Sequence, residues 1–224
     1  MKHLCITLDL SGKGSERAPD YSETMRSHLK LILNMVATVS VLPCAATCWI
    51  AKKIGIGESQ SFLFWGQFLA IIPGLPGVYL RRAYYRMTLD YCAPDCHIGF
   101  GTLFAHRESR VESEVYIGNY AMFGHVDLKK GSLIGSRSSI LSGMNQHQFS
   151  PDGKWLPANL DDFTQVTVGE YAWVGEAAVI MADIGVGAAA SAGSVVSQEL
   201  PDFVVVAGNP ARFVRKMEVS QNND

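Results

Sequence analysis

Charge is scarce in this sequence, and neither sign dominates. Charged residues make up 18% of the 224 residues, and the formal net charge is −2 at pH 7. Proteins that coat nucleic acid usually carry a basic surplus, so this balance argues against nucleic acid as a partner. Hydrophobic residues make up 48% of the chain, which argues against extended disorder.

Cysteine is scarce as well. The chain has five cysteines, an odd number, and their spacing is not that of a small disulfide scaffold, so a reducing compartment is the simplest interpretation. The first residues contain no apolar core of the signal-peptide type, and we expect no secretion by that route.

Two long uncharged runs lie in the first half of the chain. They extend from Leu31 to Ala51 and from Ser59 to Leu80, and each approaches the ~20 residues that a spanning helix needs. Pro43 predicts a kink in the first run. The segment Pro73-Gly74-Leu75-Pro76-Gly77 predicts that a helix in the second run stops near Ile72.

We expect these runs to attach the protein to membrane lipid, as a broken hairpin or as two interfacial helices. Basic residues at the ends of the runs would meet anionic lipid heads: Arg26, Lys30, Lys52, Lys53, Arg81, Arg82 and Arg86. The alternative is two helices buried against each other or against another subunit. The predicted organisation is a polar, flexible N-terminus (1–28), an apolar helical segment (29–86), a β domain (87–216) with an inserted loop (146–165), and a flexible C-terminal tail (217–224).

A period of about six residues begins at Ile98, where aliphatic or aromatic residues recur and are often followed by glycine. This period is neither helical nor that of a simple alternating strand. It fits a β-solenoid in which each hexad forms a short strand and a turn, with its first residue in a narrow core. A sandwich of short strands is the weaker alternative. Five unbroken hexads are expected after Gln165, led by Val168, Val174, Ile180, Val186 and Ala192.

The end of this region carries the most specific motif, Val204-Val205-Val206-Ala207-Gly208-Asn209-Pro210-Ala211-Arg212. Together with the rungs at 172–175 and 192–196, it resembles the hexapeptide-repeat acyltransferases, closest in pattern to the sugar and polysaccharide O-acetyltransferases. The resemblance covers about half of the chain. It implies a mainly β fold, a left-handed parallel β-helix, and a homotrimer in which each active site lies between two subunits.

Acyl transfer needs a base for the acceptor's proton, and histidine suits this role because its unperturbed pKa of ~6.5 lies near neutrality. The hexads stop after Ile140 and resume at Val168, and the polar segment between them contains His147. Long loops that leave a rigid scaffold often carry binding sites. In the resembling enzymes a loop after a rung carries the catalytic histidine. We therefore predict His147 as general base, with His125 as the alternative and Asn145 as a residue that orients the acceptor.

Acetyl-CoA or another acyl-CoA is the expected co-substrate, and no metal is predicted. By resemblance, its pantetheine arm lies along the turns of stacked coils. The predicted contacts to the arm are Gly175, Ala177, Ala192, Gly193 and the flanking Trp173. Guanidinium and ammonium groups bind phosphates well, so three basic residues are predicted to hold the CoA phosphates: Arg212, Arg215 and Lys216.

Two other functions stay open. A zinc lyase similar to the gamma-type carbonic anhydrases would use histidines of the same solenoid, and the chain supplies His97, His106, His125 and His147. A membrane-attached scaffold without activity would leave the loop histidine and the basic tail without a role. In the transferase interpretation the acceptor is a small-molecule sugar, a glycolipid or a polysaccharide precursor, and the supply of CoA predicts the cytoplasmic face of the inner or plasma membrane.

Overall fold

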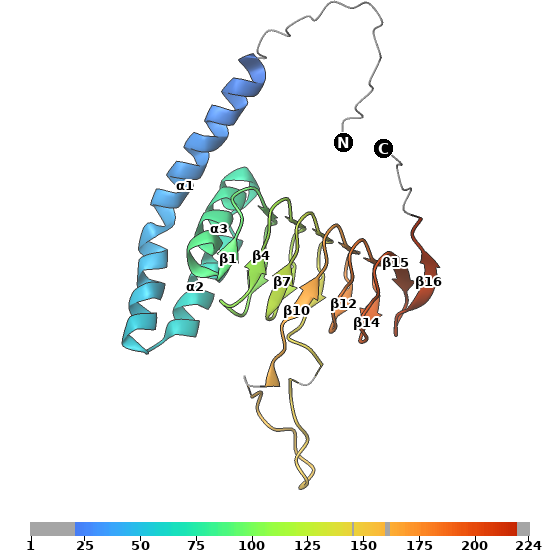
Figure 1. The fold of residues 1–224 in the computed structure, drawn as a ribbon. Coiled ribbons are helices and arrows are strands. Elements are labelled where there is room, and N and C mark those ends of the chain that lie inside the picture. Colours follow the sequence, from blue (N-terminus) through green and yellow to red (C-terminus); the bar gives the residue numbers. More distant parts are fainter. Residues whose placement is uncertain (1–20, 145, 160–161, 219–224) are drawn as a thin grey trace, which may run out of the picture.

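The computed structural model describes residues 21–144, 146–159 and 162–218. Three helices precede a solenoid of short strands (Figure 1). The helices are α1 (Tyr21–Ile54), α2 (Glu58–Ala70) and α3 (Gly74–Thr88). The predicted fold class, a parallel β-solenoid preceded by apolar helices, is confirmed.

The strands form three sheets that wrap around the solenoid, and we call them faces A, B and C. Face A contains β1 (Tyr91–Cys92), β4 (Arg110–Val111), β7 (Val126–Leu128) and β10 (Val166–Val168). Face B contains β2 (His97–Ile98), β5 (Tyr116–Ile117), β8 (Leu133–Ile134), β11 (Trp173–Val174), β13 (Ala189–Ala190), β15 (Val204–Ala207) and β16 (Arg212–Lys216). Face C contains β3 (Leu103–Phe104), β6 (Met122–Phe123), β9 (Ser139–Ile140), β12 (Val179–Ile180) and β14 (Val195–Val196).

Neighbouring coils pair in parallel, and only the last described pair, β15 with β16, is antiparallel. Most of the parallel strands have two residues, and the second of these is buried in the core. The inward residue of face A is followed after six residues by that of face B, as from Val111 to Ile117, and after six more by that of face C, at Phe123. The step from face C to face A has no fixed length. The six-residue spacing therefore holds from face A to face B and from face B to face C. The spacing from face C to face A varies, so that this corner is irregular.

The irregular corner corrects the predicted hexad phase. After Ile180 the next inward residue is Ile184, only four positions on, which bridges Val168 on the coil before. Ile184 is 2% exposed, whereas Val186, which we expected to lead a hexad, is 37% exposed. Ala192 is likewise exposed and lies in a turn. Ile184 is buried because it pairs with Val168 on the coil before, although this pairing shortens the spacing from Ile180 to four residues.

Helices α2 and α3 close the first end of the solenoid core. Phe62 of α2 packs on Tyr85 of α3, whose ring lies 4.8 Å from that of Phe104 on face C. Phe104 in turn stacks on Phe123 of the next coil at 4.6 Å. The hydrophobic core is thus continuous from the helices into the coils.

A buried arginine joins the helices to the first coil. Arg81 of α3 is 1% exposed and donates through Nη1 to the carbonyl oxygens of Leu69, in the last turn of α2, and of Ile72, just beyond it, at 3.2 and 2.8 Å. Its Nε donates to the carbonyl of Ile98 on β2 at 3.1 Å. A cation at a helix C-terminus satisfies carbonyls that the helix leaves without partners.

Helix α1 lies against α2 and α3 on the side away from the solenoid (Figure 1). Its buried face carries Val41, Ala45 and Cys48 at helical spacing, while Val39 on the other face is 66% exposed. Among the described residues, the stretch His28–Ile54 is the one helix whose length and mean hydropathy, 1.9, would suffice to cross a membrane.

The helical segment differs from the expectation in two respects. Helix α1 already begins at Tyr21 rather than near residue 29. Pro43, where we expected a kink, lies inside this one helix. A third helix, α3, follows the Pro-Gly segment, where the sequence suggested only a stop. That stop is real, because α2 ends at Ala70. Residues 1–20 and 219–224, expected to be flexible, lie outside the described residues.

Candidate active site

The irregular corner between faces C and A, called here the C–A corner, gathers two predicted histidines. Phe104, Phe123 and Ile140 are partners on successive coils of face C. The residues two positions later, His106, His125 and Ser142, therefore stack along the corner. The rings of His106 and His125 lie 6.3 Å apart.

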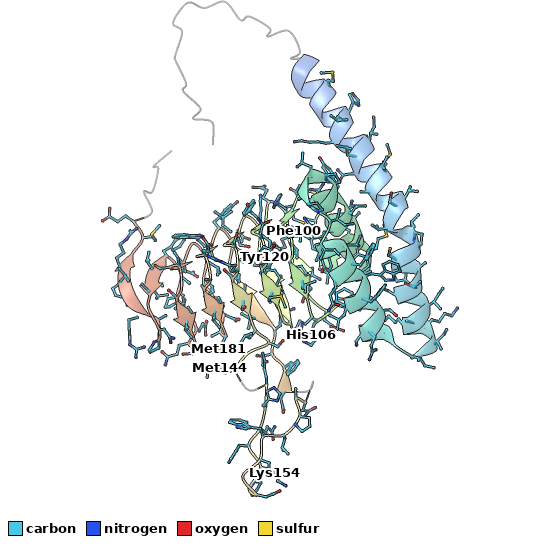
Figure 2. All side chains as sticks on the ribbon, turned by 180° about the vertical axis from the view of Figure 1, so that it is seen from behind. Phe100, His106, Tyr120, Met144, Lys154 and Met181 are labelled. Carbon is cyan, nitrogen blue, oxygen red and sulfur yellow. The ribbon has the colours of Figure 1, made fainter. Side chains whose placement is uncertain are left out.

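The inserted loop leaves the solenoid at this corner. Figure 2 shows His106, Met144 and Met181 along one edge of the solenoid, with Lys154 at the far tip of the loop. The loop is an ordered hairpin: Phe149 and Trp155 form an antiparallel bridge, and their rings are 5.1 Å apart.

His147 stands at the base of that hairpin, and its side chain is exposed. Its Nδ1 lies 3.1 Å from the carbonyl oxygen of Leu156. A carbonyl only accepts hydrogen bonds, so Nδ1 is the donor, and in the neutral imidazole the lone pair is then on Nε2. The backbone N–H of Leu156 donates to the carbonyl of Gln148 at 2.8 Å, which holds the two hairpin arms together. The hydrogen bond thus fixes which ring nitrogen faces the backbone and leaves Nε2 on the other side of the ring.

His125 is engaged differently. Its Nε2 lies 3.0 Å from Nε2 of Gln165, and because the amide nitrogen is a donor, the imidazole nitrogen accepts. The lone pair that a general base needs is therefore occupied. The neighbouring His106 is half-buried, and this burial lowers its pKa below the ordinary value of about 6.5. His106 is accordingly neutral at pH 7.

Two adjoining cavities lie between helix α2 and the C–A corner. The first, of about 370 Å³, is mixed in character and lined by aromatic, acidic and imidazole groups: Glu58, Phe62, His106, Arg107, Glu108, His125 and Phe163. The second, of about 300 Å³, is mainly apolar and extends over strands β3, β6 and β9 to Gln146, next to His147. Both cavities are lined by Ala105, His106 and Phe163. In the wall of the first one, Arg107 forms an ion pair with Glu58 at 3.1 Å.

The predicted pantetheine contacts lie at a different edge, the corner between faces B and C, called here the B–C corner. Gly175 and Ala177 follow β11, and Ala192 and Gly193 follow β13 one coil later. Ala177 and Gly193 occupy equivalent turn positions, with φ of 56° and 69°. In Figure 2, Phe100 and Tyr120 mark this corner on the opposite edge from His106.

The structure thus brings these four turn residues together and separates them from His147. Trp173 is 48% exposed on face B, beside the same corner. Arg212, Arg215 and Lys216 all lie on the exposed strand β16, at the edge of face B. Asn145 lies outside the described residues.

Sequence reasoning missed three features of this site. Gln165, whose side chain forms a hydrogen bond with His125, follows the loop and belongs to no recognisable sequence motif. The Leu156 carbonyl orients His147, and the sequence does not reveal this because the partner is a backbone group. The cavities depend on α2, which lies outside the resemblance.

One of the four histidines of the zinc-lyase alternative lies apart from two others. His97 stacks on Tyr116 of face B at 4.7 Å, away from the corner that carries His106 and His125. Within residues 21–144, 146–159 and 162–218, no group of three or more His, Cys, Asp or Glu residues is placed to hold a metal ion. The zinc-lyase alternative stays a prediction.

Comparisons with known proteins agree with the solenoid. No protein-family model matches the chain. Serine acetyltransferase 2 of Arabidopsis thaliana is 45% identical over 53 residues, which cover 23% of this chain and 16% of that protein. The galactoside O-acetyltransferase of Lactococcus lactis is 25% identical over 134 residues, which cover 58% of each chain. The chain therefore spans well under two thirds of the length of these relatives.

Among solved structures, a hexapeptide-repeat acetyltransferase from Vibrio cholerae, in complex with acetyl-CoA, superposes with a TM-score of 0.61. The match covers 75% of this chain and 92% of that one at 16% identity. This identity establishes the fold alone. The resemblance read from the tail motif and the fold agree, and the second half of this chain is a left-handed hexapeptide-repeat solenoid of the kind found in the acetyltransferases.

Proposed function

We propose that this protein is a CoA-dependent O-acetyltransferase that acts on a sugar-containing acceptor, with His147 as general base. The observation that carries the proposal is the hydrogen bond from Nδ1 of His147 to the Leu156 carbonyl, at 3.1 Å. It leaves Nε2 free to take a proton on a loop beside a cavity. The acetyltransferase relatives and the shared fold support the reaction class.

The reaction is a direct transfer. Nε2 of His147 removes the proton of an acceptor hydroxyl, the oxygen attacks the thioester carbonyl of acetyl-CoA, and the C–S bond breaks. CoA leaves as a thiolate, and the imidazolium returns the proton to it. A backbone N–H of an adjacent coil is the proposed donor to the oxyanion.

The separation of the two corners supports a site shared between subunits. The loop histidine and the turns at Gly175 and Gly193 lie on different edges of one solenoid. They meet at one CoA molecule when the C–A corner of one copy faces the B–C corner of the next. A homotrimer arranges three such sites by symmetry.

The acceptor assignment rests on the first cavity. Carbohydrate rings are bound by aromatic faces and by side chains that exchange hydrogen bonds with hydroxyls. Phe62 and Phe163 supply the aromatic surface, and Glu58, Glu108 and neutral His106 supply the polar groups. The relative that acts on galactosides favours the same acceptor class.

The helical segment supports membrane attachment at the face where acetyl-CoA is available, the cytoplasmic one. Outward-facing side chains of α1 such as Met35, Val39 and Ile50 are 52%, 66% and 57% exposed. Apolar surface of this kind marks membrane or protein contacts in a folded protein. A lipid-linked sugar or a polysaccharide precursor is the matching acceptor.

Acetyl-CoA binding, measured by calorimetry on the detergent-purified full chain, tests the cofactor. We expect saturable binding that His147→Ala retains and Arg212→Ala weakens about tenfold, because one phosphate contact is lost. Arg110→Ala, which removes an exposed arginine on face A over Tyr91, is the matched control and should bind as the unaltered protein does. If the full chain binds neither acetyl-CoA nor CoA, the proposal is wrong.

A further inference from the structure

An apolar groove runs between helices α1 and α3, far from the candidate active site. It has a volume of about 280 Å³ and is lined by Leu33, Val36, Ala37, Ser40, Leu75, Pro76, Tyr79 and Leu80. The Ser40 hydroxyl donates to the Val36 carbonyl of its own helix at 2.8 Å, so its proton is not available to a ligand. The groove is therefore a site for an apolar chain.

One end of the groove is cationic. The guanidinium of Arg82 lies over the ring of Tyr79, 4.8 Å from its centroid. It donates to the Cys96 carbonyl at 3.0 Å and to Oδ1 of Asn34 at 2.7 Å. Both partners are neutral oxygens, and within the part of the chain that the structure describes no carboxylate forms an ion pair with Arg82. Its Nε is buried without a hydrogen-bond partner there.

More positive charge lies near Arg82. Lys30 precedes Asn34 by one turn of α1, Arg86 follows Arg82 by one turn of α3, and both side chains are exposed. Guanidinium groups prefer phosphate and carboxylate oxygens to neutral acceptors. This end of the groove is thus suited to a negatively charged head group.

We propose that the groove binds one acyl chain of an anionic phospholipid, with the lipid phosphate at Arg82. The surrounding surface agrees with a lipid environment, because Ile32 and Val39, outside the groove on the same helix, are 51% and 66% exposed. A second copy of the same surface would bring like charges together at Arg82 and Lys30. The inference does not depend on the proposed acetyl transfer.

Native mass spectrometry of the full-length protein, reconstituted in vesicles and then extracted with mild detergent, tests the site. The two probes are phosphatidylglycerol and phosphatidylcholine with the same oleoyl chains. We expect one retained phosphatidylglycerol per protomer and at least tenfold less phosphatidylcholine. Equal retention of both lipids, or of neither, would overturn the proposal.

Three variants locate the lipid. Val36→Trp fills the groove and should reduce retention of phosphatidylglycerol about tenfold, while Val39→Trp, the same change on the exposed face three residues on, should retain it. Arg82→Gln should remove the preference between the two lipids, and Arg82→Lys should keep part of it because the charge is preserved.

The same spectra report oligomeric mass. If Val36→Trp leaves retention equal to that of Val39→Trp, the lipid lies elsewhere on α1. If Val36→Trp changes the number of protomers in the assembly instead of the lipid count, the groove is a contact between copies. Either result contradicts the proposal.

Discussion

At the scale of single residues, the two candidate bases differ in the nitrogen that each leaves available. His147 donates through Nδ1 to a backbone carbonyl, whereas His125 accepts at Nε2 from Gln165. The sequence predicts a histidine on the loop but not its tautomer, because the partner is a backbone group nine residues away. The structural argument for His147 over His125 as general base therefore depends on these two hydrogen bonds, and both form only when the loop is folded.

Replacing His147 by alanine should reduce kcat by about 10²–10⁴-fold, the usual contribution of general-base catalysis, and leave KM for acetyl-CoA nearly unchanged. Steady-state kinetics with a galactoside acceptor provide the measurement. His125→Ala, the matched control at the same corner, should lose less than tenfold. A greater loss in His125→Ala than in His147→Ala would reverse the assignment.

Two half-buried histidines link stability to pH. Burial is the main cause that lowers the pKa of both His97 and His106, and the neighbouring Arg81 and Arg82 lower that of His97 further. As the pH falls below about 6.5, the unfolded chain takes up protons that the folded chain does not. The free energy of unfolding should therefore decrease from pH 7 to pH 5.5.

Thermal unfolding at several pH values measures this decrease. His106→Gln removes one of the two groups, so the slope of stability against pH should become smaller between pH 7 and 5.5. An unchanged slope would show that His106 keeps its ordinary pKa in the folded protein.

At the scale of elements, the hexad period predicted the spacing of inward residues across two of the three corners, from face A to face B and from face B to face C. It located the inward residues from Ile98 to Ile180 but assigned the wrong phase afterwards, where Ile184 replaces Val186 in the core. A period alone cannot reveal a shortened turn, because Val186 and Ile184 are both aliphatic. Pairing with Val168 on the coil before decides which one is buried.

The two predicted CoA-binding glycines have different structural roles. A Cβ on Gly175 would approach the backbone nitrogen of Ala192 to 2.4 Å, whereas a Cβ on Gly193 would meet no atom within 4 Å. Gly193 instead needs its φ of 69°, which costs a residue with a side chain roughly 1–2 kcal/mol.

Gly175→Ala should therefore destabilise the solenoid by about 2–3 kcal/mol, because the coils must move apart, and Gly193→Ala by about 1 kcal/mol. Urea denaturation of the two variants in parallel tests the order. Equal losses would show that the coils separate at little cost.

At the scale of the whole molecule, the proposed homotrimer would bring together groups that lie apart in one chain. The loop that carries His147 leaves the solenoid after face C, whereas the predicted CoA-binding turns follow the strands of face B. The sequence alone cannot show this separation, because both sets of residues belong to the same repeats. The second uncharged run predicted a helix that stops near Ile72, and α2 confirms it. The cavities between α2 and the C–A corner were beyond prediction, because they depend on how the helix packs against the solenoid.

Co-expression of His147→Ala and Arg212→Ala chains tests a site shared between subunits. In randomly mixed trimers about a quarter of the interfaces combine an intact loop with an intact basic strand, so activity should recover to about that fraction of the unaltered enzyme. Separately tagged chains purified as mixed assemblies provide the sample. No recovery in mixed assemblies would place the complete site within one chain.

The position of α2 and α3 at the first end of the core has a consequence for synthesis on the ribosome. Among the described elements, the helices precede the strands, and α3 carries the ring of Tyr85, which packs on Phe104 of the first coil. We expect each new coil to pack on a surface that is already made, so that long loops need not be closed at random. The order of translation is the order of stacking, from the helical platform to the antiparallel strand that ends the last coil.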